Sequence, residues 1–457
     1  MMKVLRTLLL AASAALAALG LGACPASDAK RPNVLFLAVD TLRADRLGCY
    51  GNPRGLTPNL DRLAALGLRF EDATAHAPWT LPSFASLFTS LYPTEHGAGG
   101  RLPDFRGLSA RTPTVAETFR AAGFETAAIT NVDFLGPTYG VCRGFEHLDA
   151  VSFDSNEELR RAGATTDAAL AWLGKRGEEP WFLFVHYFDA HASYDPPKEF
   201  RARFAEPEDR DTAWRFGSRA ELIAHRQGRL ALDRATIARA EALYDAEVAY
   251  VDAEIGRLLE RSGALDPTRR TIVVLTSDHG EEFLDHGAWE HGHSVYQELV
   301  HVPLIVAAPG RLAPGTIAAP VRHVDVAPTL CELADLAPPP TFRGTSLLGL
   351  AAGPSAKPKN SLSEGAFLGP PRRAWRHGAD KLIVSEERGL ELYDLAADPK
   401  EARDRSRAEF ARALELAGEL ELADKAFRRA HGESVELSPE ERTRLESLGD
   451  TDGAEKR

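Results

Sequence analysis

The sequence predicts an α/β fold in which a mostly parallel central sheet is flanked by helices, and a small antiparallel sheet follows toward the C-terminus. Two observations lead to this prediction. Apolar runs typical of buried strands alternate with segments of helical periodicity, and polar side chains directly follow several of these runs. Because 44% of the 457 residues are hydrophobic and 26% are charged, the chain has the composition of a globular protein with a large core.

Strands and helices are expected in alternating order. The run 33–39 (NVLFLAV) is apolar throughout, which is typical of a strand buried on both faces. Between Pro82, which suits the first position of a helix, and Leu91, apolar residues recur at helical spacing. By the same criteria we expect strands at 33–39, 126–130, 181–188, 271–276 and 302–307, and helices at 59–66, 82–91, 115–122, 159–173 and 231–261. Short runs at 374–376, 381–384 and 390–394 predict the antiparallel sheet.

The chain is expected to divide into five segments. They are a signal peptide over 1–23, a linker over 24–32, a main domain over 33–344, an antiparallel subdomain over 345–400 and a charged helical tail over 401–457. The first residues are basic, the apolar run after them is short for a membrane span, and Cys24 follows it directly. This junction resembles the lipid-attachment motif of bacterial lipoproteins. It implies a protein tethered at Cys24 to the bacterial cell envelope, on its periplasmic or outer face, with an ordinary signal peptide as the alternative.

The charge pattern favours a small anionic ligand over a nucleic acid. The net charge of −12 argues against nucleic-acid binding, which usually needs a basic patch or stripe. Thr80 stands just before the predicted helix at 82–91, where free backbone N–H groups and the helix dipole favour an anion. A hydroxyl at an anion site is a candidate nucleophile for a phosphate or sulfate ester, although a side chain at this position also suits a helix cap.

Polar side chains gather after the predicted strands. Those that follow a strand closely are Asp40, Asn131, Asp189 with His191, and Asp278 with His279. Because open α/β sheets bind ligands at the carboxyl ends of their strands, we expect these side chains to line one site. Asp40, Asp278 and His279 offer two carboxylates and one imidazole, which suit a divalent cation such as Ca²⁺, Zn²⁺ or Mn²⁺.

Further residues are assigned roles around this site. Close to such an ion, the hydroxyl of Thr80 would lose its proton more readily. The candidates to hold the remaining ester oxygens or to protonate the leaving group are His191, Asn131 and His293.

Other residues are expected to lie outside the chemistry. His186 is expected to be a core histidine, and His286 and His291 solvated loop residues. Glu281 and Glu282 are expected to be surface charges, with outer-shell partners of the site as the alternative, and Asp245, Glu247 and Asp252 the solvated face of a long helix.

Several motifs, in one order along 32–400, carry a resemblance to a known family. They are 33–40 (NVLFLAVD) with 47–51 (LGCYG), 80–97, 126–128 (TAA), 144–146 (GFE), 180–194, 276–280 (TSDHG), Glu298 with 302–304 (VPL), and 392–395 (LYDL) with 398–399 (DP). In this order they resemble the sulfatase family of the alkaline phosphatase superfamily. The resemblance implies an alkaline-phosphatase-like catalytic domain over 33–344. It also implies one or two metal ions, with the ligands Asp40, Thr80, Asp278 and His279. His191 would protonate the leaving group, and His293 takes a place where the family often has a Lys or His that grips the ester.

The nucleophile motif departs from the family. Sulfatases carry Cys or Ser, any residue, Pro, any residue and Arg, and the Cys or Ser is oxidised to formylglycine. Here the frame runs from Thr80 to Phe84 (TLPSF), and oxidation of Thr would give a ketone, so no formylglycine is expected. The family's paired Asp-Asp is Asp40-Thr41, and a frequent Lys is replaced by Asn131. An unmodified Thr is the nucleophile of the superfamily's phosphoryl-transfer branches, so phosphate esters and diesters are favoured over sulfate esters.

The resemblance therefore implies a metal-dependent hydrolase of a small anionic ester, or of a glycan or lipid head group reached from the membrane anchor. Three alternatives stay open. They are an arylsulfatase-like hydrolase of sulfuric esters, a transferase of phospho-head groups, and a degenerate protein that keeps the metal pocket without turnover. Such transferases usually carry several transmembrane helices, and no further apolar run of that length follows the signal, which favours a hydrolase.

Overall fold

A computed structural model describes residues 30–101, 104–151, 160–211, 216–351, 359–365, 367–427, 429 and 432–447. The predicted signal peptide and the lipid site at Cys24 lie outside the described residues, so export and lipid attachment stay predictions. Residues Pro32–Arg457 form one compact unit, which the following paragraphs describe. Across the described part of the chain, no helix has both the length and the apolar character that crossing a membrane requires.

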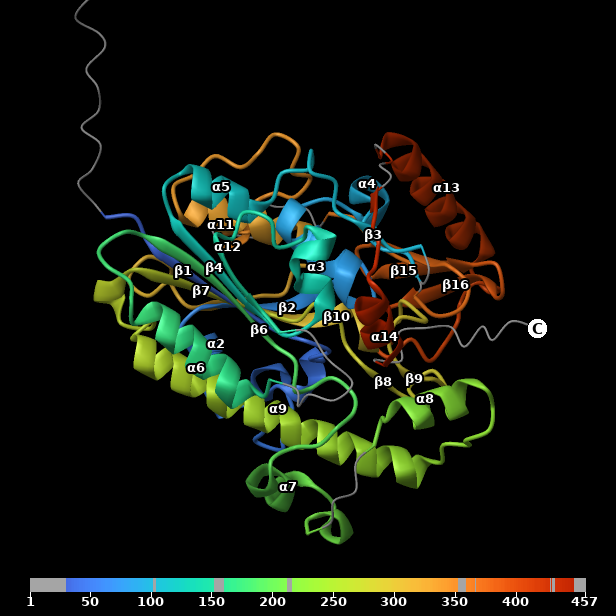
Figure 1. Ribbon diagram of the computed structural model, residues 1–457. Helices are drawn as coiled ribbons and strands as arrows, with labels where there is room; N and C mark the ends of the chain where they lie inside the picture. Colours follow the sequence, from blue (N-terminus) through green and yellow to red (C-terminus); the bar gives the residue numbers. More distant parts are fainter. Residues whose placement is uncertain are drawn as a thin grey trace, which may run out of the picture. The chain divides into compact units, whose positions relative to one another are not determined.

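The unit is built on a nine-stranded sheet with the strand order β11-β2-β10-β7-β1-β6-β4-β5, in which β12 also pairs with β2 (Figure 1). Its strands are β1 (Asn33–Val39), β2 (Leu68–Thr74), β4 (Glu125–Thr130), β5 (His147–Ala150), β6 (Trp181–Tyr187), β7 (Thr271–Thr276), β10 (His301–Ala307), β11 (Gly315–Ile317) and β12 (Val321–Arg322). Only β10 runs antiparallel to its neighbours β2 and β7 among these pairings. The predicted α/β class with a mostly parallel sheet is confirmed.

Both faces of the sheet are covered, which explains why β1 is apolar throughout. Val34, Phe36 and Ala38 pack into one core, and the alternate residues of β1 pack into a second core on the opposite face. Helices α3, α5 and α11 lie over the first face, and α2, α6 and α9 over the second (Figure 1). Their bounds are α2 (Pro58–Ala65), α3 (Thr80–Thr89), α5 (Val115–Ala121), α6 (Ala162–Leu173), α9 (Arg234–Ser262) and α11 (Val326–Leu333).

A separate four-stranded antiparallel sheet follows, as predicted. It contains β13 (Ser361–Glu364), β14 (Arg372–His377), β15 (Asp380–Ser385) and β16 (Gly389–Asp394). Helix α13 (Phe410–Ala426) covers this sheet through Ala413, Leu416 and Leu420 (Figure 1). The remaining short elements are α4 (Pro93–His96), β3 (Arg106–Gly107), α7 (Lys198–Phe204), α8 (Arg219–Arg226), β8 (Glu282–Phe283), β9 (Trp289–Glu290), α10 (Gln297–Val300), α12 (Leu348–Ala351), β17 (Glu433–Ser434) and α14 (Pro439–Ser447).

The acidic residues of α9 are not a solvated face, so that prediction is wrong. Asp245, Glu247 and Asp252 are buried, because other segments pack around the helix. The carboxylate of Asp252 accepts hydrogen bonds from the backbone N–H groups of Asn59 and Leu60 at the start of α2. A carboxylate at a helix N-terminus is stabilised by the free N–H groups and the dipole there, so Asp252 fixes α2 against α9.

Candidate functional site

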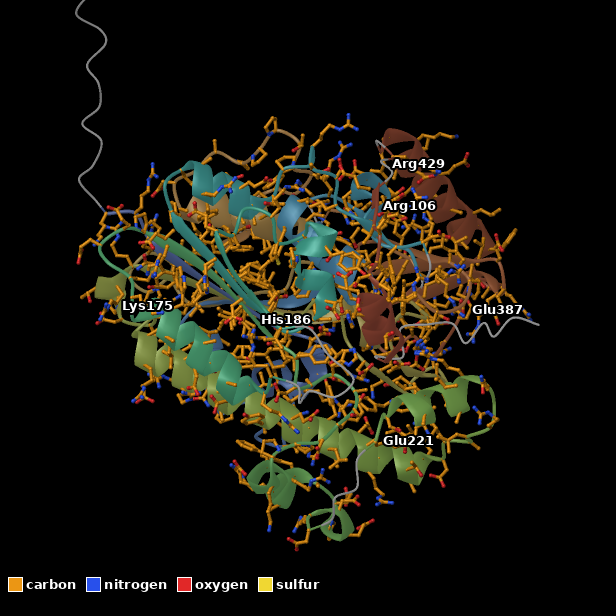
Figure 2. The ribbon with its side chains drawn as sticks, in the orientation of Figure 1. Arg106, Lys175, His186, Glu221, Glu387 and Arg429 are labelled. Carbon is orange, nitrogen blue, oxygen red and sulfur yellow. The ribbon has the colours of Figure 1, made fainter. Side chains whose placement is uncertain are left out.

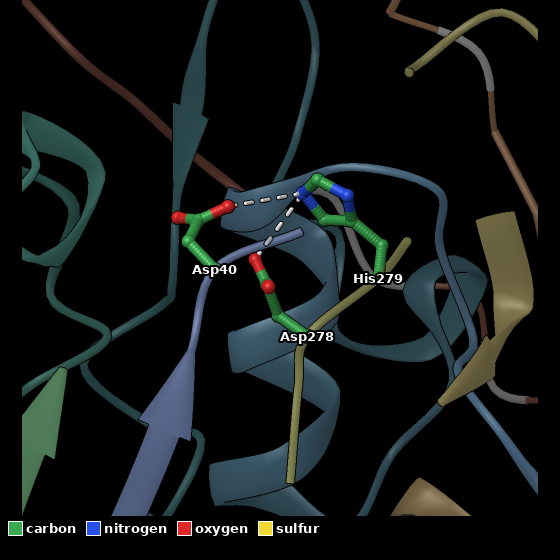
Figure 3. A group of neighbouring side chains, drawn as sticks. All are labelled: Asp40, Asp278 and His279. Atoms are coloured by element: carbon green, nitrogen blue, oxygen red, sulfur yellow. Dashed lines mark ion pairs between the residues drawn. The ribbon is translucent and has the colours of Figure 1, made fainter. Parts of the chain in front are cut away.

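The two strands at the centre of the sheet bring the predicted metal ligands together. Strands β1 and β7 pair in parallel, with Ala38 opposite Thr276, so Asp40 and Asp278 leave the sheet at the same edge. Nε2 of His279 lies 3.3 Å from Oδ2 of Asp278 and 3.7 Å from Oδ1 of Asp40 (Figure 3). All three side chains are fully buried, which marks an unusual concentration of charge in the protein interior.

The chemistry of this trio fits a divalent cation. Among the described residues, Oδ1 of Asp40 and both carboxylate oxygens of Asp278 have no hydrogen-bond partner, although all three atoms are buried. A buried carboxylate without a partner is costly, and a cation removes that cost. One ligand atom from each residue lies within 4.8 Å of the others. Nδ1 of His279 donates to the carbonyl of Gly280 at 2.9 Å, which leaves Nε2 with the lone pair that a metal ion needs.

The pKa values of the two carboxyl groups of the trio are shifted in opposite directions. Burial, followed by the charge of Asp40, raises the pKa of Asp278 to about 7. Burial also acts to raise the pKa of Asp40, but the hydrogen bond from His186 and the electrostatic interactions with His186, His191 and His279 hold that pKa well below its usual range. Asp40 is therefore the permanently ionised member of the pair.

His186 was interpreted as a core histidine, and the structure gives it a second role. It lies in β6, is fully buried near the centre of the molecule (Figure 2), and its Nε2 lies 3.0 Å from Oδ2 of Asp40. This contact occupies one oxygen of Asp40 and leaves Oδ1 facing His279. His186 thus orients a predicted metal ligand from within the sheet.

Thr80 lies at the first residue of α3 and its hydroxyl faces the trio. The N-cap position is taken by Trp79, and no side chain caps this helix, so the alternative that Thr80 is only a cap is wrong. Pro82 stands third in the helix, after two residues that we expected to precede it. Oγ1 of Thr80 lies 3.5 Å from Nε2 of His279, and the residue is only 5% exposed. The hydroxyl is therefore beside both the candidate metal ligands and the free N–H groups of α3.

Two further histidines extend the site, since His291 packs against His279 and His191 packs against His291, and sequence reasoning found only His191. The ring of His191 stacks on Phe188 with 4.4 Å between centroids. The ring of His291 lies 4.4 Å from that of His279 and 4.9 Å from that of His191. His291 is buried, and its Nδ1 lies 2.8 Å from a carboxylate oxygen of the fully buried Glu281. The predictions of a solvated His291 and a surface Glu281 are wrong.

Asn131 and His293 make other contacts. The amide of Asn131, at the end of β4, donates to Thr165 and to the carbonyl of His186 and accepts from Arg160 at 2.6 Å. Nε2 of His293 lies 2.7 Å from a carboxylate oxygen of Glu282, which is buried rather than a surface charge. These contacts engage the Asn131 amide and one ring nitrogen of His293, and the substrate-binding roles of both residues stay predictions.

Comparisons with known proteins identify the family and the fold. The family model "Sulfatase" matches residues 32–336, and the model "N-sulphoglucosamine sulphohydrolase, C-terminal" matches residues 285–422. An uncharacterized sulfatase of Escherichia coli is 27% identical over 429 residues, which cover 81% of this chain and 82% of that protein.

Two solved structures share the fold. One, in complex with its substrate D-glucosamine-2-N,6-O-disulfate, has a TM-score of 0.72 at 23% identity and covers 87% of this chain and 98% of its own. The other, a phosphonate monoester hydrolase of Agrobacterium radiobacter, has a TM-score of 0.70 at 22% identity, with coverage of 87% and 96%. These likenesses show the fold, and the family model spans more than half of the chain. The chain therefore belongs to the sulfatase family of hydrolases.

Proposed function

We propose that this protein is a metal-dependent hydrolase of phosphate monoesters or diesters that uses Thr80, without modification, as its nucleophile. One observation carries the proposal. The buried hydroxyl of Thr80, at the N-terminus of α3, lies 3.5 Å from Nε2 of His279, which is one of the three candidate metal ligands. A hydroxyl that shares a dry site with unpaired carboxylate oxygens and helix N–H groups suits attack on an anionic ester.

A divalent cation would be held by Asp40, Asp278 and His279. When bound, it would supply positive charge for an ester oxygen and lower the pKa of a nearby hydroxyl. The imidazole among these ligands favours Zn²⁺ or Mn²⁺ over Ca²⁺, which prefers oxygen ligands alone. His186 would keep Asp40 oriented whether or not the ion is present, because its contact with Oδ2 is made inside the protein.

The chain's own groups account for both halves of the reaction. Oγ1 of Thr80 forms a bond to phosphorus as the bond between phosphorus and the leaving oxygen breaks, and the backbone N–H groups that begin α3 face the developing charge. The Thr80 hydroxyl gives its proton to a free Nε2 of the cluster of His191 and His291, and the cluster passes that proton to the leaving oxygen. Water then attacks phosphorus as the bond to Oγ1 breaks, and a proton of that water returns to Oγ1 and restores the Thr80 hydroxyl.

The nucleophile decides between phosphate and sulfate esters. A formylglycine hydrate carries a second hydroxyl that can expel a bound sulfate, and Thr80 has no such group. The family's Arg is replaced by Phe84, whose ring lies 5.7 Å from that of Phe184 and 5.4 Å from that of His186. Position 84 therefore faces the aromatic core and offers no positive charge to a sulfate. Because solved neighbours act on both a sulfated sugar and a phosphonate ester, sulfate esters belong in the test.

The test is turnover of three esters by purified metal-free protein after addition of Mn²⁺, Zn²⁺ or Ca²⁺. The substrates are nitrophenyl phosphate, bis-nitrophenyl phosphate and nitrophenyl sulfate. We expect metal-dependent release of nitrophenol from at least one phosphate ester and little from the sulfate. Faster cleavage of the sulfate would support the arylsulfatase alternative. Absence of turnover on all three, with metal bound, would support a binding protein that has lost catalysis.

A further inference from the structure

We propose that Glu281 and Tyr194 are positioning residues for His291, which they fix in one orientation beside the reacting ester. The proposal rests on the function proposed above, because it assigns His291 to the same site. It adds two residues that touch neither the ligand trio nor the nucleophile in any described contact. From the sequence, Glu281 was expected to be a surface charge rather than an outer-shell partner, Tyr194 had no assigned role, and no feature of the local sequence marks them as a pair.

Both oxygens of the Glu281 carboxylate make hydrogen bonds. Oε1 lies 2.8 Å from Nδ1 of His291, and Oε2 accepts a hydrogen bond from the hydroxyl of Tyr194 at 2.9 Å. Glu281 and Tyr194 are both fully buried, so water does not compete for these bonds. A carboxylate oxygen accepts hydrogen bonds, so Nδ1 of His291 must carry the proton that it donates to Glu281. The lone pair of the ring is then on Nε2.

The same tautomer recurs around the site. Nδ1 of His279 donates to the carbonyl of Gly280 at 2.9 Å, and Nδ1 of His191 donates to the carbonyl of Ala192 at 2.6 Å. All three rings therefore keep Nε2 free of these bonds. His291 is distinguished by having a carboxylate as its acceptor, which makes the stronger, charge-assisted bond. All three imidazoles of the cluster are therefore in the Nδ1–H tautomer. For His291, whose ring packs against the other two, Glu281 fixes that tautomer.

The backbone on both sides of His291 is also restrained. Glu290, the last residue of β9, has φ +80°, a left-handed conformation that a glutamate adopts only under restraint from its surroundings. Its buried carboxylate forms an ion pair with Arg226 of α8. On the other side, the N–H of Gly292 donates to the carbonyl of Pro78, two residues before Thr80, at 3.0 Å. With the main chain held at both ends, the remaining freedom is rotation of the His291 ring, which Glu281 removes.

Two matched controls exist in the same molecule. His286 and Glu298 form a second His–Glu pair, with Nδ1 and Oε1 2.7 Å apart. Tyr296 donates to Glu391 at 2.8 Å, which repeats the bond between Tyr194 and Glu281. Nε2 of His286 also contacts the carbonyl of Glu401, and Tyr296 contacts Glu391, so both pairs lie against the C-terminal region. Neither pair makes a described contact with Thr80 or the ligand trio. Loss of a buried bond of the same kind is therefore separable from loss of His291 orientation.

The experiment compares Glu281→Ala, Glu281→Gln and Tyr194→Phe with the controls Glu298→Gln and Tyr296→Phe, all in the full-length metal-loaded protein. Tautomers are assigned from the ¹⁵N chemical shifts of the histidine rings, and kcat and KM are measured on the best ester of the panel. We expect Glu281→Ala to lower kcat by ~10- to 100-fold at unchanged metal content, and Glu281→Gln, which keeps one acceptor oxygen, to restore most of it. Tyr194→Phe should lower kcat less, and both controls should leave kcat within twofold.

The two proposals fail in different ways. If wild-type protein cleaves none of the esters, the proposed function is wrong, and the ring shifts alone decide the positioning role. If His291 keeps an Nδ1–H tautomer with unchanged ring shifts in Glu281→Ala, which removes the acceptor, the positioning proposal is wrong whatever the rates show. Equal losses of kcat in Tyr194→Phe and Tyr296→Phe would also contradict it, since they would reflect general destabilisation.

Discussion

The hydroxyl oxygen of Thr80 lies 3.5 Å from Nε2 of His279, although 199 residues separate the two in the sequence. Helix α3 begins at Thr80, and the loop after β7 carries His279 to the same edge of the sheet. The proposed nucleophile and the proposed metal ligands therefore lie at one place in the fold, and substitution of one should alter the chemistry of the other.

Thr80→Ala should reduce kcat on bis-nitrophenyl phosphate by ~10³-fold or more, because it removes the attacking oxygen. Thr80→Ser keeps the oxygen and should retain measurable turnover. Metal content, determined by elemental analysis, should stay close to the wild-type value in both variants, since the carboxylates and the imidazole remain. An Ala variant that keeps the wild-type metal-dependent rate would remove Thr80 from the mechanism.

Asp278→Asn should weaken metal binding, because it replaces one of the unpaired carboxylates of the trio. In wild-type protein, Mn²⁺ or Zn²⁺ at ~100 times its dissociation constant should stabilise the fold by about 2.7 kcal/mol, seen as a higher Tm. The variant should show a much smaller rise. Asp285→Asn, which alters a half-buried carboxylate paired with Arg43, is the control and should keep the full rise. Equal rises in both variants would place the ion elsewhere.

The meeting of Asp40, Asp278 and His279 could be predicted because of how parallel strands are arranged. Asp40 and Asp278 each follow an apolar strand, and parallel strands end at one edge, so their meeting follows from topology alone. Thr80 could be predicted from a local signal, the start of an amphipathic helix. For these residues a single sequence contains the needed information, since the strand and helix patterns are strong.

His291 and Glu281 could not be predicted, because their burial depends on distant partners. They lie around two strands of two residues each, β8 and β9, too short to give a periodic pattern. Glu281 is enclosed by Tyr194, 87 residues away. His186 contacts Asp40, which is 146 residues away in the sequence. Neither contact can be read from composition or periodicity. Glu281 was therefore expected to be a surface charge and His186 a core histidine, which are the commonest roles of such residues.

His291→Ala should cost more than His293→Ala. The ring of His291 packs against those of His279 and His191, whereas Nε2 of His293 is engaged by Glu282 at 2.7 Å. We expect kcat/KM on the best phosphate ester to fall by ~10²-fold or more in the first variant and by less than tenfold in the second. The reverse order would restore His293 to the substrate-gripping role that the family resemblance gives it.

The pair formed by His286 and Glu298 should make stability depend on pH. Burial opposes protonation of His286, but the hydrogen bond and the charge of Glu298 raise the pKa of His286 to about 9. A raised pKa gives stability that is complete below the unfolded value of about 6.5 and is lost as pH rises through about 9. Burial also raises the pKa of the partner, Glu298, above its usual range.

The effect should be visible as a difference in Tm between wild type and Glu298→Gln. The pair should contribute on the order of 2 kcal/mol at pH 6, and the gap in Tm should shrink between pH 7 and pH 9.5. Scans of both proteins in matched buffers, without added metal, check this. A gap that stays constant over that range would show that His286 is neutral in the folded protein.

Phe84→Arg, which restores the family's residue in the nucleophile motif, should destabilise the protein rather than create a sulfatase. Phe84 is fully buried, and its ring lies 6.0 Å from that of Phe88 and 5.7 Å from that of Phe184. A guanidinium at this position would lose its hydration without gaining a partner, at a cost of several kcal/mol. Phe84→Leu, which keeps an apolar side chain, should cost only about 1.5 kcal/mol. Thermal scans of the two variants measure the loss of stability, and turnover of nitrophenyl sulfate measures any gain of sulfatase activity. A stable Arg variant that gains turnover of the sulfate would show that position 84 reaches the ester.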